Sequence, residues 1–289
     1  MVTSASEALR APRPVPTGRG AAFFDLDGTL IPGSANIPLA REAIRAGLLR
    51  PAELAHDLRN GVSLLTHGSR DERPAVLLDR VLTAVAGRPA EEFEAVADRV
   101  VVDMVASITP AIRRVLDEHA AAGRDRIVLS AGPTEIVSRL AQVAGLELGL
   151  GTTAETDDEG RYTGRLAGPF CHHDGKAEAL RALAAERGYD LAACFAYSDS
   201  ISDLPMLEAV GHPVAVNPEP ELRELAENRG WPIVASARMQ RVSFTHAHSW
   251  VLLGQRLAAG TIGAVVSLGT RPVEAGDDLD TADDLEPGL

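Results

Sequence analysis

The 289-residue chain is poor in cysteine, in aromatic residues and in positive charge. Its two cysteines, Cys171 and Cys194, are too few for a disulfide scaffold or a cysteine-based metal framework, and such usage is typical of a reduced cytoplasmic protein. Lysine and arginine together number 28 against 41 acidic residues, which gives a formal net charge of −13. Because nucleic-acid binding requires a basic surface, we expect no nucleic-acid partner. From the cysteine usage we expect a cytoplasmic protein.

The two ends of the chain lack the patterns of packed structure. Residues 1–20 contain no apolar h-region, so they do not read as a secretory signal, and we predict a flexible leader there. Residues 270–289 carry seven acidic residues and one arginine. Segments with such charge and few large apolar side chains cannot bury enough surface to fold. We therefore predict an acidic, disordered tail over 270–289.

One long stretch is short of charge. Residues 250–268, WVLLGQRLAAGTIGAVVSL, carry a single charged residue, Arg256. A helix that spans a bilayer needs ~20 apolar residues, and an arginine within the span is unfavourable. We interpret 241–269 as an apolar C-terminal helix that covers the core or a dimer surface, with membrane contact through 250–268 as the alternative. The oligomeric state stays open.

The middle of the chain alternates between strand-like and helix-like patterns. Buried strands are predicted at 21–27, 126–130, 191–199 and 212–217, with helical spacing between the later ones and a hairpin turn at 158–160. This alternation predicts an α/β fold with a doubly wound, mainly parallel sheet. We assign the core to residues 21–36 and 106–240.

Residues 37–105 contain almost no strand pattern. Four segments place apolar residues at helical spacing, with Pro38 and Pro51 near helix starts and Gly68 and Gly87 near helix ends. This pattern predicts an all-helical cap inserted after the first strand.

Polar side chains follow the predicted strands where each strand ends. Asp25 and Asp27 follow the first strand, Ser130 ends the second, and Asp199 comes at the end of a later one, with Asp203 close behind. In open parallel sheets, ligands bind at the carboxyl ends of the strands. Carboxylates gathered there suit a hard divalent cation, and Mg²⁺ prefers carboxylates together with water and substrate phosphate.

These residue types suit phosphate chemistry. One aspartate can attack phosphorus and form an aspartyl-phosphate, and the aspartate two positions on can protonate the leaving group and then activate water. Ser130 and Lys176, which begins a predicted helix, can hold phosphoryl oxygens. The backbone N–H groups over 26–28 are expected to add further donors at the turn.

The order Asp25-x-Asp27-Gly-Thr29, Ser130, Lys176 and Asp199…Asp203 resembles the four motifs of the haloacid dehalogenase-like (HAD) phosphohydrolase superfamily. The helical insert after the first motif is similar to the cap of its phosphoserine-phosphatase-like subfamily, subfamily IB. The resemblance covers roughly residues 21–235. It implies a Rossmann-like core and a Mg²⁺-dependent phosphatase that acts on a small phosphorylated metabolite.

The resemblance also implies roles for individual residues. Asp25 would be the nucleophile and Asp27 the general acid and base. Asp25, the backbone carbonyl of Asp27, and Asp199 would ligate Mg²⁺, and Asp203 would orient that shell. The phosphate-binding residues would be Thr29, Ser130, Ala131 and Lys176.

Four positions depart from the phosphoserine-phosphatase pattern. Gly28 stands where those enzymes usually have serine, Ala131 where they have glycine, and Ser202 where they have asparagine. Ser34 stands where they place the glutamate that holds the amino group of the substrate. Phosphate chemistry is therefore better supported than serine recognition, and the substrate stays unnamed.

Two other functions stay open on the same motifs. One is a regulatory or phosphoacceptor protein that uses the aspartate pocket with little or no turnover. The other is a lipid-phosphate phosphatase held at a membrane by residues 250–268.

Overall fold

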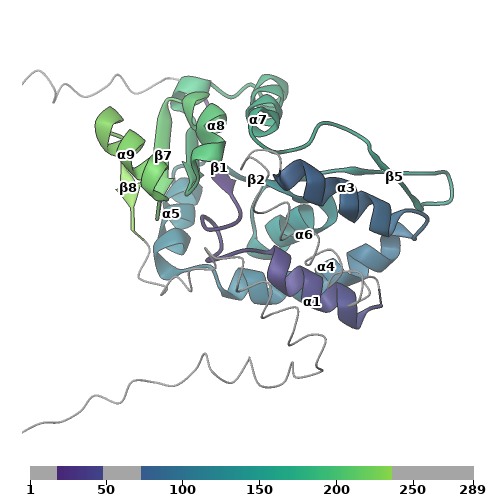
Figure 1. The fold of residues 1–289 in the computed structure, drawn as a ribbon. Helices are drawn as coiled ribbons and strands as arrows, with labels where there is room; N and C mark the ends of the chain where they lie inside the picture. The colour runs from purple at the N-terminus through teal and green to yellow at the C-terminus, as the bar shows by residue number, and fades with distance from the viewer. Residues whose placement is uncertain (1–17, 48–72, 236–289) are drawn as a thin grey trace, which may run out of the picture.

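The computed structural model describes residues 18–47 and 73–235, and a six-stranded sheet forms its centre (Figure 1). The strands are β1 (Ala21–Asp25), β2 (Asp125–Pro133), β3 (Leu148–Thr152), β6 (Phe195–Ser198), β7 (His212–Val216) and β8 (Ile233–Val234). All neighbouring strands of this sheet pair in parallel, in the order β3-β2-β1-β6-β7-β8. The predicted α/β fold with a parallel sheet is confirmed.

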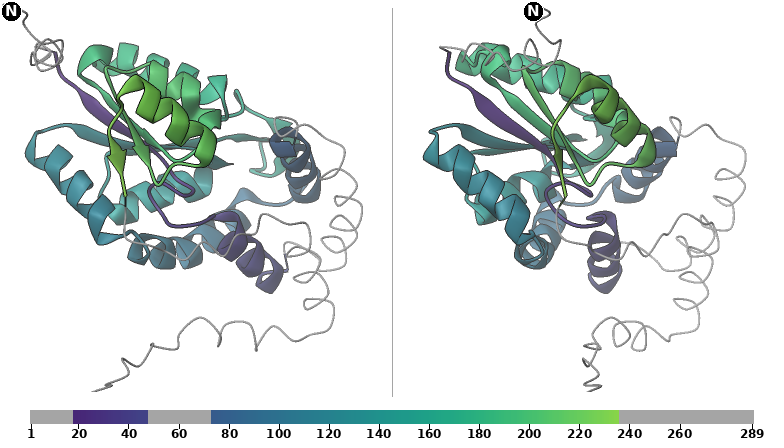
Figure 2. Two further views of the ribbon diagram at one scale, coloured as in Figure 1. Left: turned by 60° about the vertical axis from the view of Figure 1, so that its left-hand side comes forward. Right: turned by 90° about the vertical axis from the view of Figure 1, so that its left-hand side faces the viewer.

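Helices cover both faces of the sheet (Figure 2). They are α1 (Asn36–Arg45), α3 (Arg73–Val85), α4 (Ala90–Ala106), α5 (Pro110–Ala121), α6 (Thr134–Ala144), α7 (Asp174–Arg187), α8 (Leu204–Glu208) and α9 (Pro220–Arg229). Two short 3-10 turns, η2 (Leu191–Ala193) and η3 (Ile201–Asp203), lie on either side of β6. Helices α1, α3 and α4 fall in the segment for which the sequence predicts a helical cap.

The alternation of side chains along β1 explains the two layers. Ala21 and Phe23 are fully buried in a cluster with side chains of α7, α8 and α9. Ala22 and Phe24 point to the opposite face and join a second cluster with α4, α5 and α6. Successive side chains of a strand point to opposite faces, so a strand covered on both faces is apolar throughout. This is why AAFF contains no polar position.

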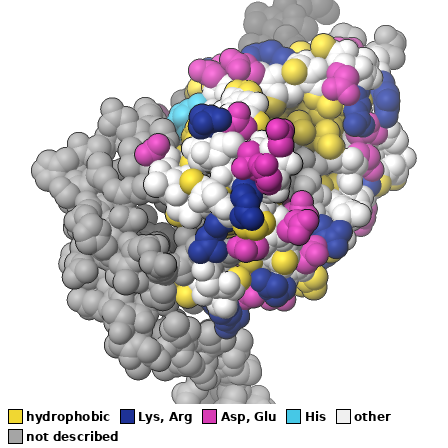
Figure 3. Space-filling model, turned by 90° about the vertical axis from the view of Figure 1, so that its right-hand side faces the viewer, with side chains coloured by type: hydrophobic (Ala, Val, Ile, Leu, Met, Phe, Trp, Pro, Cys, Tyr) yellow, Lys and Arg dark blue, Asp and Glu magenta, His cyan; other side chains and the backbone are white. Residues whose placement is uncertain are grey.

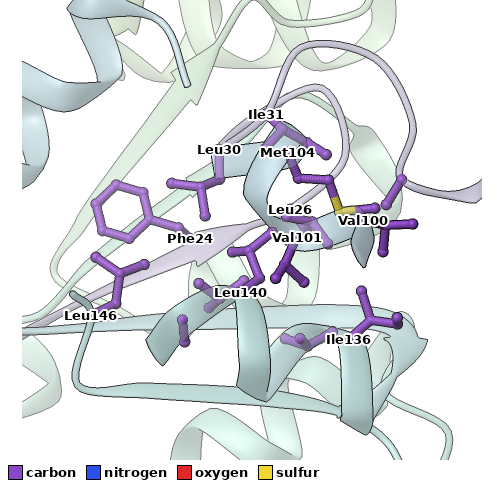
Figure 4. Close-up of a cluster of buried hydrophobic side chains, with 14 of the residues drawn as sticks. Phe24, Leu26, Leu30, Ile31, Val100, Val101, Met104, Ile136, Leu140 and Leu146 are labelled. Atoms are coloured by element: carbon purple, nitrogen blue, oxygen red, sulfur yellow. The ribbon is translucent and has the colours of Figure 1, made fainter. Parts of the chain in front are cut away.

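Helix α4 packs directly on the α/β body (Figure 4). Its side chains Val101 and Met104 lie in the same buried cluster as Leu26 and Leu30, which follow β1, and as Leu140 of α6. Each fully buried side chain of this size stabilises the fold by about 1.5–3 kcal/mol relative to exposure. The loop after β1 is therefore held from outside by apolar contacts with α4.

A two-stranded antiparallel hairpin, β4 (Ala154–Thr156) with β5 (Tyr162–Leu166), follows β3. The turn between α3 and α4 is joined to this hairpin through its backbone. Gly87 N–H donates to the carbonyl of Tyr162 at 2.7 Å, and Tyr162 N–H donates to the carbonyl of Arg88 at 2.9 Å. The hairpin predicted at 158–160 is present and supports this turn.

Some predicted strand boundaries are wrong. The apolar run 191–199 is only partly a strand, because Asp190 accepts a hydrogen bond from Ala192 N–H and the 3-10 turn η2 comes first. Strand β1 stops at Asp25, two residues before the predicted end, and β2 continues past Ser130 to Pro133.

The segments predicted as leader, apolar C-terminal helix and acidic tail lie almost wholly outside the described residues, as does the stretch 250–268. Among the described helices, none is long and apolar enough to cross a membrane. On the face shown in Figure 3, acidic and basic side chains are interspersed, and no broad basic area is visible there.

His119 of α5 is a buried, neutral histidine in the core. It is 3% exposed, its Nε2 lies 2.8 Å from the Tyr197 hydroxyl, and its Nδ1 lies 3.3 Å from Arg124 Nη1. Because a guanidinium can only donate, Nδ1 accepts and Nε2–H donates to the Tyr197 oxygen. Burial lowers the pKa of His119 to about 4, and the positive charges of Arg124 and Arg126 act in the same direction.

We expect the wild-type protein to lose stability relative to His119→Gln as the pH falls from 7 to 5. In that window the unfolded histidine binds a proton and the folded one does not, so stability falls as the pH falls. Glutamine does not titrate and can still donate to Tyr197. Urea unfolding at pH 7 and at pH 5 should show that the free energy of unfolding of the wild type, relative to that of His119→Gln, falls by roughly 2 kcal/mol. A difference in unfolding free energy that is the same at both pH values would contradict the assignment of His119 as a neutral core histidine.

Candidate active site

Three strands deliver predicted site residues to one edge of the sheet. Asp25 ends β1 and pairs with Leu129 of β2, so Ser130 comes next on that side. Asp199 directly follows β6, the strand on the other side of β1. The strands that follow β1 in the chain lie first on one side of it, as β2 and β3, and later on the other side, as β6, β7 and β8. Ligands of open α/β sheets bind in the crevice outside the point where the strand order reverses in this way.

Lys176, in the first turn of α7, lies between two carboxylates. Its Nζ donates to Asp25 Oδ1 at 2.5 Å and to Asp203 Oδ2 at 2.8 Å. Lys176 and Asp203 are 4% and 2% exposed. Burial lowers the pKa of Lys176, but the two carboxylates outweigh burial and hold that pKa above its ordinary value. The lysine is therefore a fixed positive charge that joins β1, α7 and the segment after β6.

Two buried hydroxyl or carboxylate oxygens at this edge have no partner. Asp203 Oδ2 accepts from Ser198 Oγ at 2.7 Å in addition to Lys176. In the part of the chain that the structure describes, the buried side-chain polar atoms without a hydrogen bond are Asp203 Oδ1 and Thr29 Oγ1. Unpaired buried polar atoms are unfavourable and uncommon. Both fall among the predicted site residues, which fits a polar ligand at this position.

The loop after β1 positions Asp27. Leu30 N–H donates to the carbonyl of Asp25 at 3.1 Å, which folds the chain back at once. Asp27 Oδ1 then accepts from Ala35 N–H at 2.7 Å. Burial raises the pKa of Asp27, while the hydrogen bond from Ala35, the charge of Lys176 and the nearby Ser34 side chain act against the rise. A raised pKa suits a carboxyl that must both give and accept a proton near neutral pH.

Gly28 allows Asp199 to approach the loop. Its φ is +78°, and a Cβ at this position would lie 2.1 Å from Asp199 Oδ2. A side chain would therefore be strained and would also displace the carboxylate. The prediction that backbone N–H groups over 26–28 supply donors is wrong for Gly28, because its N–H donates to the carbonyl of Gly33 at 2.8 Å.

The carboxylates at this edge exceed the positive charge that faces them. Burial raises the pKa of Asp25 to about 7, with Asp203 adding to the rise and Lys176 opposing it. Burial also raises the pKa of Asp199 to about 8, and the charges of Asp25, Asp203 and Glu219 contribute. One lysine cannot neutralise this group, so the site favours an additional cation.

Ser130 and Ala131 lie in the last part of β2, shortly before α6 begins at Thr134. Ser130 is 3% exposed, and its Oγ accepts from Gly132 N–H at 3.1 Å. The carbonyl of Ala131 accepts from Thr152 Oγ1 at 2.9 Å. The serine hydroxyl thus keeps its own proton for another acceptor, while its position is fixed through the backbone.

Sequence reasoning misses three side chains around these residues. Ser198 holds Asp203, and Glu219 contacts the segment after Asp199 through Ser200. Cys171 is buried close by, and burial raises the pKa of its thiol to about 11, so it is not a reactive thiolate. Ser198 could have been noticed as a polar residue at the end of an apolar strand. Glu219 gives no such signal, because it is distant in sequence.

Among the described residues, no three histidine, cysteine, aspartate or glutamate side chains form a group that could hold a metal by themselves. Mg²⁺ commonly binds through one or two carboxylates and fills its remaining positions with water and phosphate. The charge of Asp25 is close enough to Asp199 to raise its pKa, and Asp199 lies against Gly28, the residue that follows Asp27. This small set of protein donors suits Mg²⁺, which completes its shell with water and phosphate, better than it suits a metal held by protein side chains alone.

Three proteins with related sequences have phosphatase names. A probable phosphatase of Mycobacterium tuberculosis is 38% identical over 229 residues, which is 77% of each chain. A phosphoserine phosphatase of the same organism is 34% identical and covers 87% of this chain and 80% of its own. A histidinol-phosphatase of Neisseria meningitidis is 32% identical and covers 74% of this chain and 97% of its own.

Solved structures show the same fold. A crystal structure of a Bordetella pertussis protein of unknown function is 31% identical, with a TM-score of 0.65, and covers 75% of this chain and 99% of its own. A phospho-aspartyl intermediate analogue of phosphoserine phosphatase, at 22% identity and a TM-score of 0.52, covers 78% and 97% and supports the fold alone. The model of the haloacid dehalogenase-like hydrolases matches residues 22–208. The chain therefore belongs to the haloacid dehalogenase-like hydrolase family.

Proposed function

We propose that the protein is a Mg²⁺-dependent phosphomonoester hydrolase that forms an aspartyl-phosphate on Asp25 and acts on a small phosphorylated metabolite. The observation that carries the proposal is the buried Lys176, which holds Asp25 and Asp203 at the sheet edge where Asp199 also lies. The phosphatase names of the relatives agree with it.

In the first step, a carboxylate oxygen of Asp25 attacks phosphorus. A bond forms between that oxygen and phosphorus, and the bond from phosphorus to the ester oxygen breaks. Asp27 gives its proton to the departing oxygen and becomes a carboxylate. Lys176 engages Asp25 Oδ1, which leaves Oδ2 as the attacking oxygen, and the lysine charge offsets negative charge that builds on the phosphoryl group.

In the second step, water attacks the aspartyl-phosphate. Asp27, now unprotonated, takes a proton from the water as the new bond to phosphorus forms, and the bond to Asp25 breaks. Inorganic phosphate leaves, and both aspartates return to their starting states. The hydrogen bond from Ala35 N–H holds the Asp27 carboxyl in one place through both steps.

The residues at this edge fit Mg²⁺. Asp25, the Asp27 carbonyl and Asp199 would hold it, and when bound it would polarise the phosphoryl oxygens and neutralise the developing charge. The pKa values of Asp25 and Asp199 are raised because these carboxylates are buried with too little positive charge around them. The same shortage of positive charge favours the binding of a cation. The unpartnered Asp203 Oδ1 provides an acceptor for a water of that shell.

The leaving group of the substrate stays unassigned. Relatives carry the names of a phosphoserine phosphatase and a histidinol-phosphatase, whose named substrates share an amine near a phosphate ester. In this chain, however, that position is Ser34, whose Oγ accepts from Asn36 N–H, so it supplies no carboxylate for an amino group. A panel of phosphomonoesters, assayed for phosphate release with Mg²⁺ and with EDTA, would rank the substrates. We expect phosphoserine to be unexceptional.

We expect Asp25→Asn to abolish Mg²⁺-dependent phosphate release across that panel, because the amide cannot form the acyl phosphate. Asparagine is close in size and can still accept a hydrogen bond from Lys176, so the fold should persist and can be checked by thermal unfolding. Substantial turnover by a folded Asp25→Asn protein on several esters would refute the nucleophile assignment. Release of no phosphate by the wild type, with Mg²⁺ bound, would favour a regulatory role.

We expect Asp27→Asn to slow the hydrolysis of alkyl phosphates more than that of nitrophenyl phosphate. Alkoxide leaving groups need a proton, and general acid catalysis contributes typically 10²–10⁴-fold, whereas nitrophenolate leaves without one. The amide oxygen can still accept from Ala35 N–H. Comparison of kcat/KM for the two ester types measures the difference. Equal losses on both would argue against the acid role.

We expect Gly28→Ala to reduce the affinity for Mg²⁺ and the turnover by at least about tenfold, since its Cβ would displace Asp199 Oδ2. Gly33→Ala is the matched control, because Gly33 has a φ of +80° and open space at Cβ. Both variants carry the strain of a left-handed backbone, about 1–2 kcal/mol. If the two variants lose Mg²⁺ affinity equally, the close approach to Asp199 is not what matters.

A further inference from the structure

Glu219, on the loop between β7 and α9, contacts the segment that carries Asp199 and Asp203. Its Oε1 accepts from Ile201 N–H at 2.8 Å and from Ser200 Oγ at 3.0 Å. Its own backbone N–H donates to the carbonyl of Asp199 at 2.9 Å. Three hydrogen bonds from one residue thus reach three successive residues that begin at Asp199.

The backbone of the β7–α9 loop brings Glu219 to this position. Asn217 has a φ of +43°, a left-handed conformation that asparagine tolerates better than most residues, and its N–H donates to the carbonyl of Val234 at 2.9 Å. Glu219 then sits immediately before the first residue of α9, Pro220, yet its side chain makes no capping bond to that helix. Its carboxylate serves the neighbouring loop instead.

The contact with Ser200 extends to the rest of the turn. Ser200 Oγ donates to Glu219 and accepts from Ser202 N–H at 3.2 Å, so the carboxylate fixes the direction of this hydroxyl. The 3-10 turn η3 that begins at Ile201 ends at Asp203, the partner of Lys176. Glu219 therefore holds the backbone between Asp199 and Asp203 through hydrogen bonds. Its negative charge also lies close enough to raise the pKa of Asp199.

We propose that Glu219 is a positioning residue for the cation site. It holds the 199–203 segment in the conformation that presents Asp199, and it adds negative charge behind that carboxylate. The inference rests on the proposed function, which places Mg²⁺ at Asp25 and Asp199. Glu219 itself touches neither substrate nor metal in this account, and it acts through the backbone of Asp199 and Ile201 and through the Ser200 hydroxyl.

Two substitutions separate the hydrogen bonds from the charge. Glu219→Ala removes both, whereas Glu219→Gln keeps an oxygen that can accept from Ile201 and Ser200 and removes only the charge. Glu224→Gln is the matched control, because Glu224 is an exposed glutamate of α9, the helix that follows Glu219. Full-length proteins would be compared by calorimetric titration with Mg²⁺ alone and by hydrogen exchange over residues 200–203 in EDTA.

We expect Glu219→Ala to bind Mg²⁺ about 10–100-fold more weakly than the wild type, the usual range when a residue that orients a metal ligand is lost. Its amides at 201–203 should exchange faster in EDTA, while its unfolding temperature in EDTA stays within a few degrees. Glu219→Gln should keep the amide protection and lose less than about tenfold in affinity. Glu224→Gln should match the wild type in every measurement.

Wild-type Mg²⁺ affinity in a folded Glu219→Ala protein would overturn the inference, and so would unchanged exchange at 201–203. Equal losses of affinity in the alanine and glutamine variants would also overturn it, because the hydrogen bonds would then have no role. Failure of the proposed function looks different: the wild type itself would neither bind Mg²⁺ nor release phosphate from any ester.

Discussion

The ammonium of Lys176, buried between Asp25 and Asp203, is the interaction on which the site depends. Removing charges from water is expensive, and only close pairing with further hydrogen bonds offsets the penalty. Here both distances are short, and Ser198 supplies an additional donor to Asp203. Because the three charged groups come from β1, α7 and the segment after β6, their pairing requires the strand order and the helix position that the sheet provides.

The same pairing leaves the site with surplus negative charge, and the surrounding structure holds the carboxylates and the loop after β1 in place. Asp199 is held against Gly28, where any side chain would displace it, and Glu219 adds another carboxylate behind it. Packing from α4 onto Leu26 and Leu30 keeps the loop after β1 in place. An edge with surplus negative charge suits the divalent cation and the phosphate ester of the proposed function.

Much of this arrangement could be predicted from the sequence, because local patterns carry it. The fully apolar AAFF, the helix–strand alternation after Pro110 and the polar residues at strand ends suffice for the α/β fold and for bringing Asp25, Ser130 and Asp199 to one edge. Other features depend on contacts made in the folded structure, which the sequence pattern does not reveal. The 3-10 turn at Leu191–Ala193 reads as strand because its residues are apolar, and the use of the Gly28 N–H within its own loop depends on a contact with Gly33. Glu219 reaches the site only through the turn at Asn217, which no spacing rule reveals.

The most direct test of the account is to trap the covalent intermediate. Protein quenched during turnover of a good phosphomonoester would be treated with borohydride, which reduces an acyl phosphate of aspartate to homoserine, and its peptides analysed by mass spectrometry. We predict homoserine at Asp25, dependent on substrate and Mg²⁺, and unmodified Asp27 and Asp199. Rapid turnover with Asp25 unmodified, or reduction at another carboxylate, would contradict it.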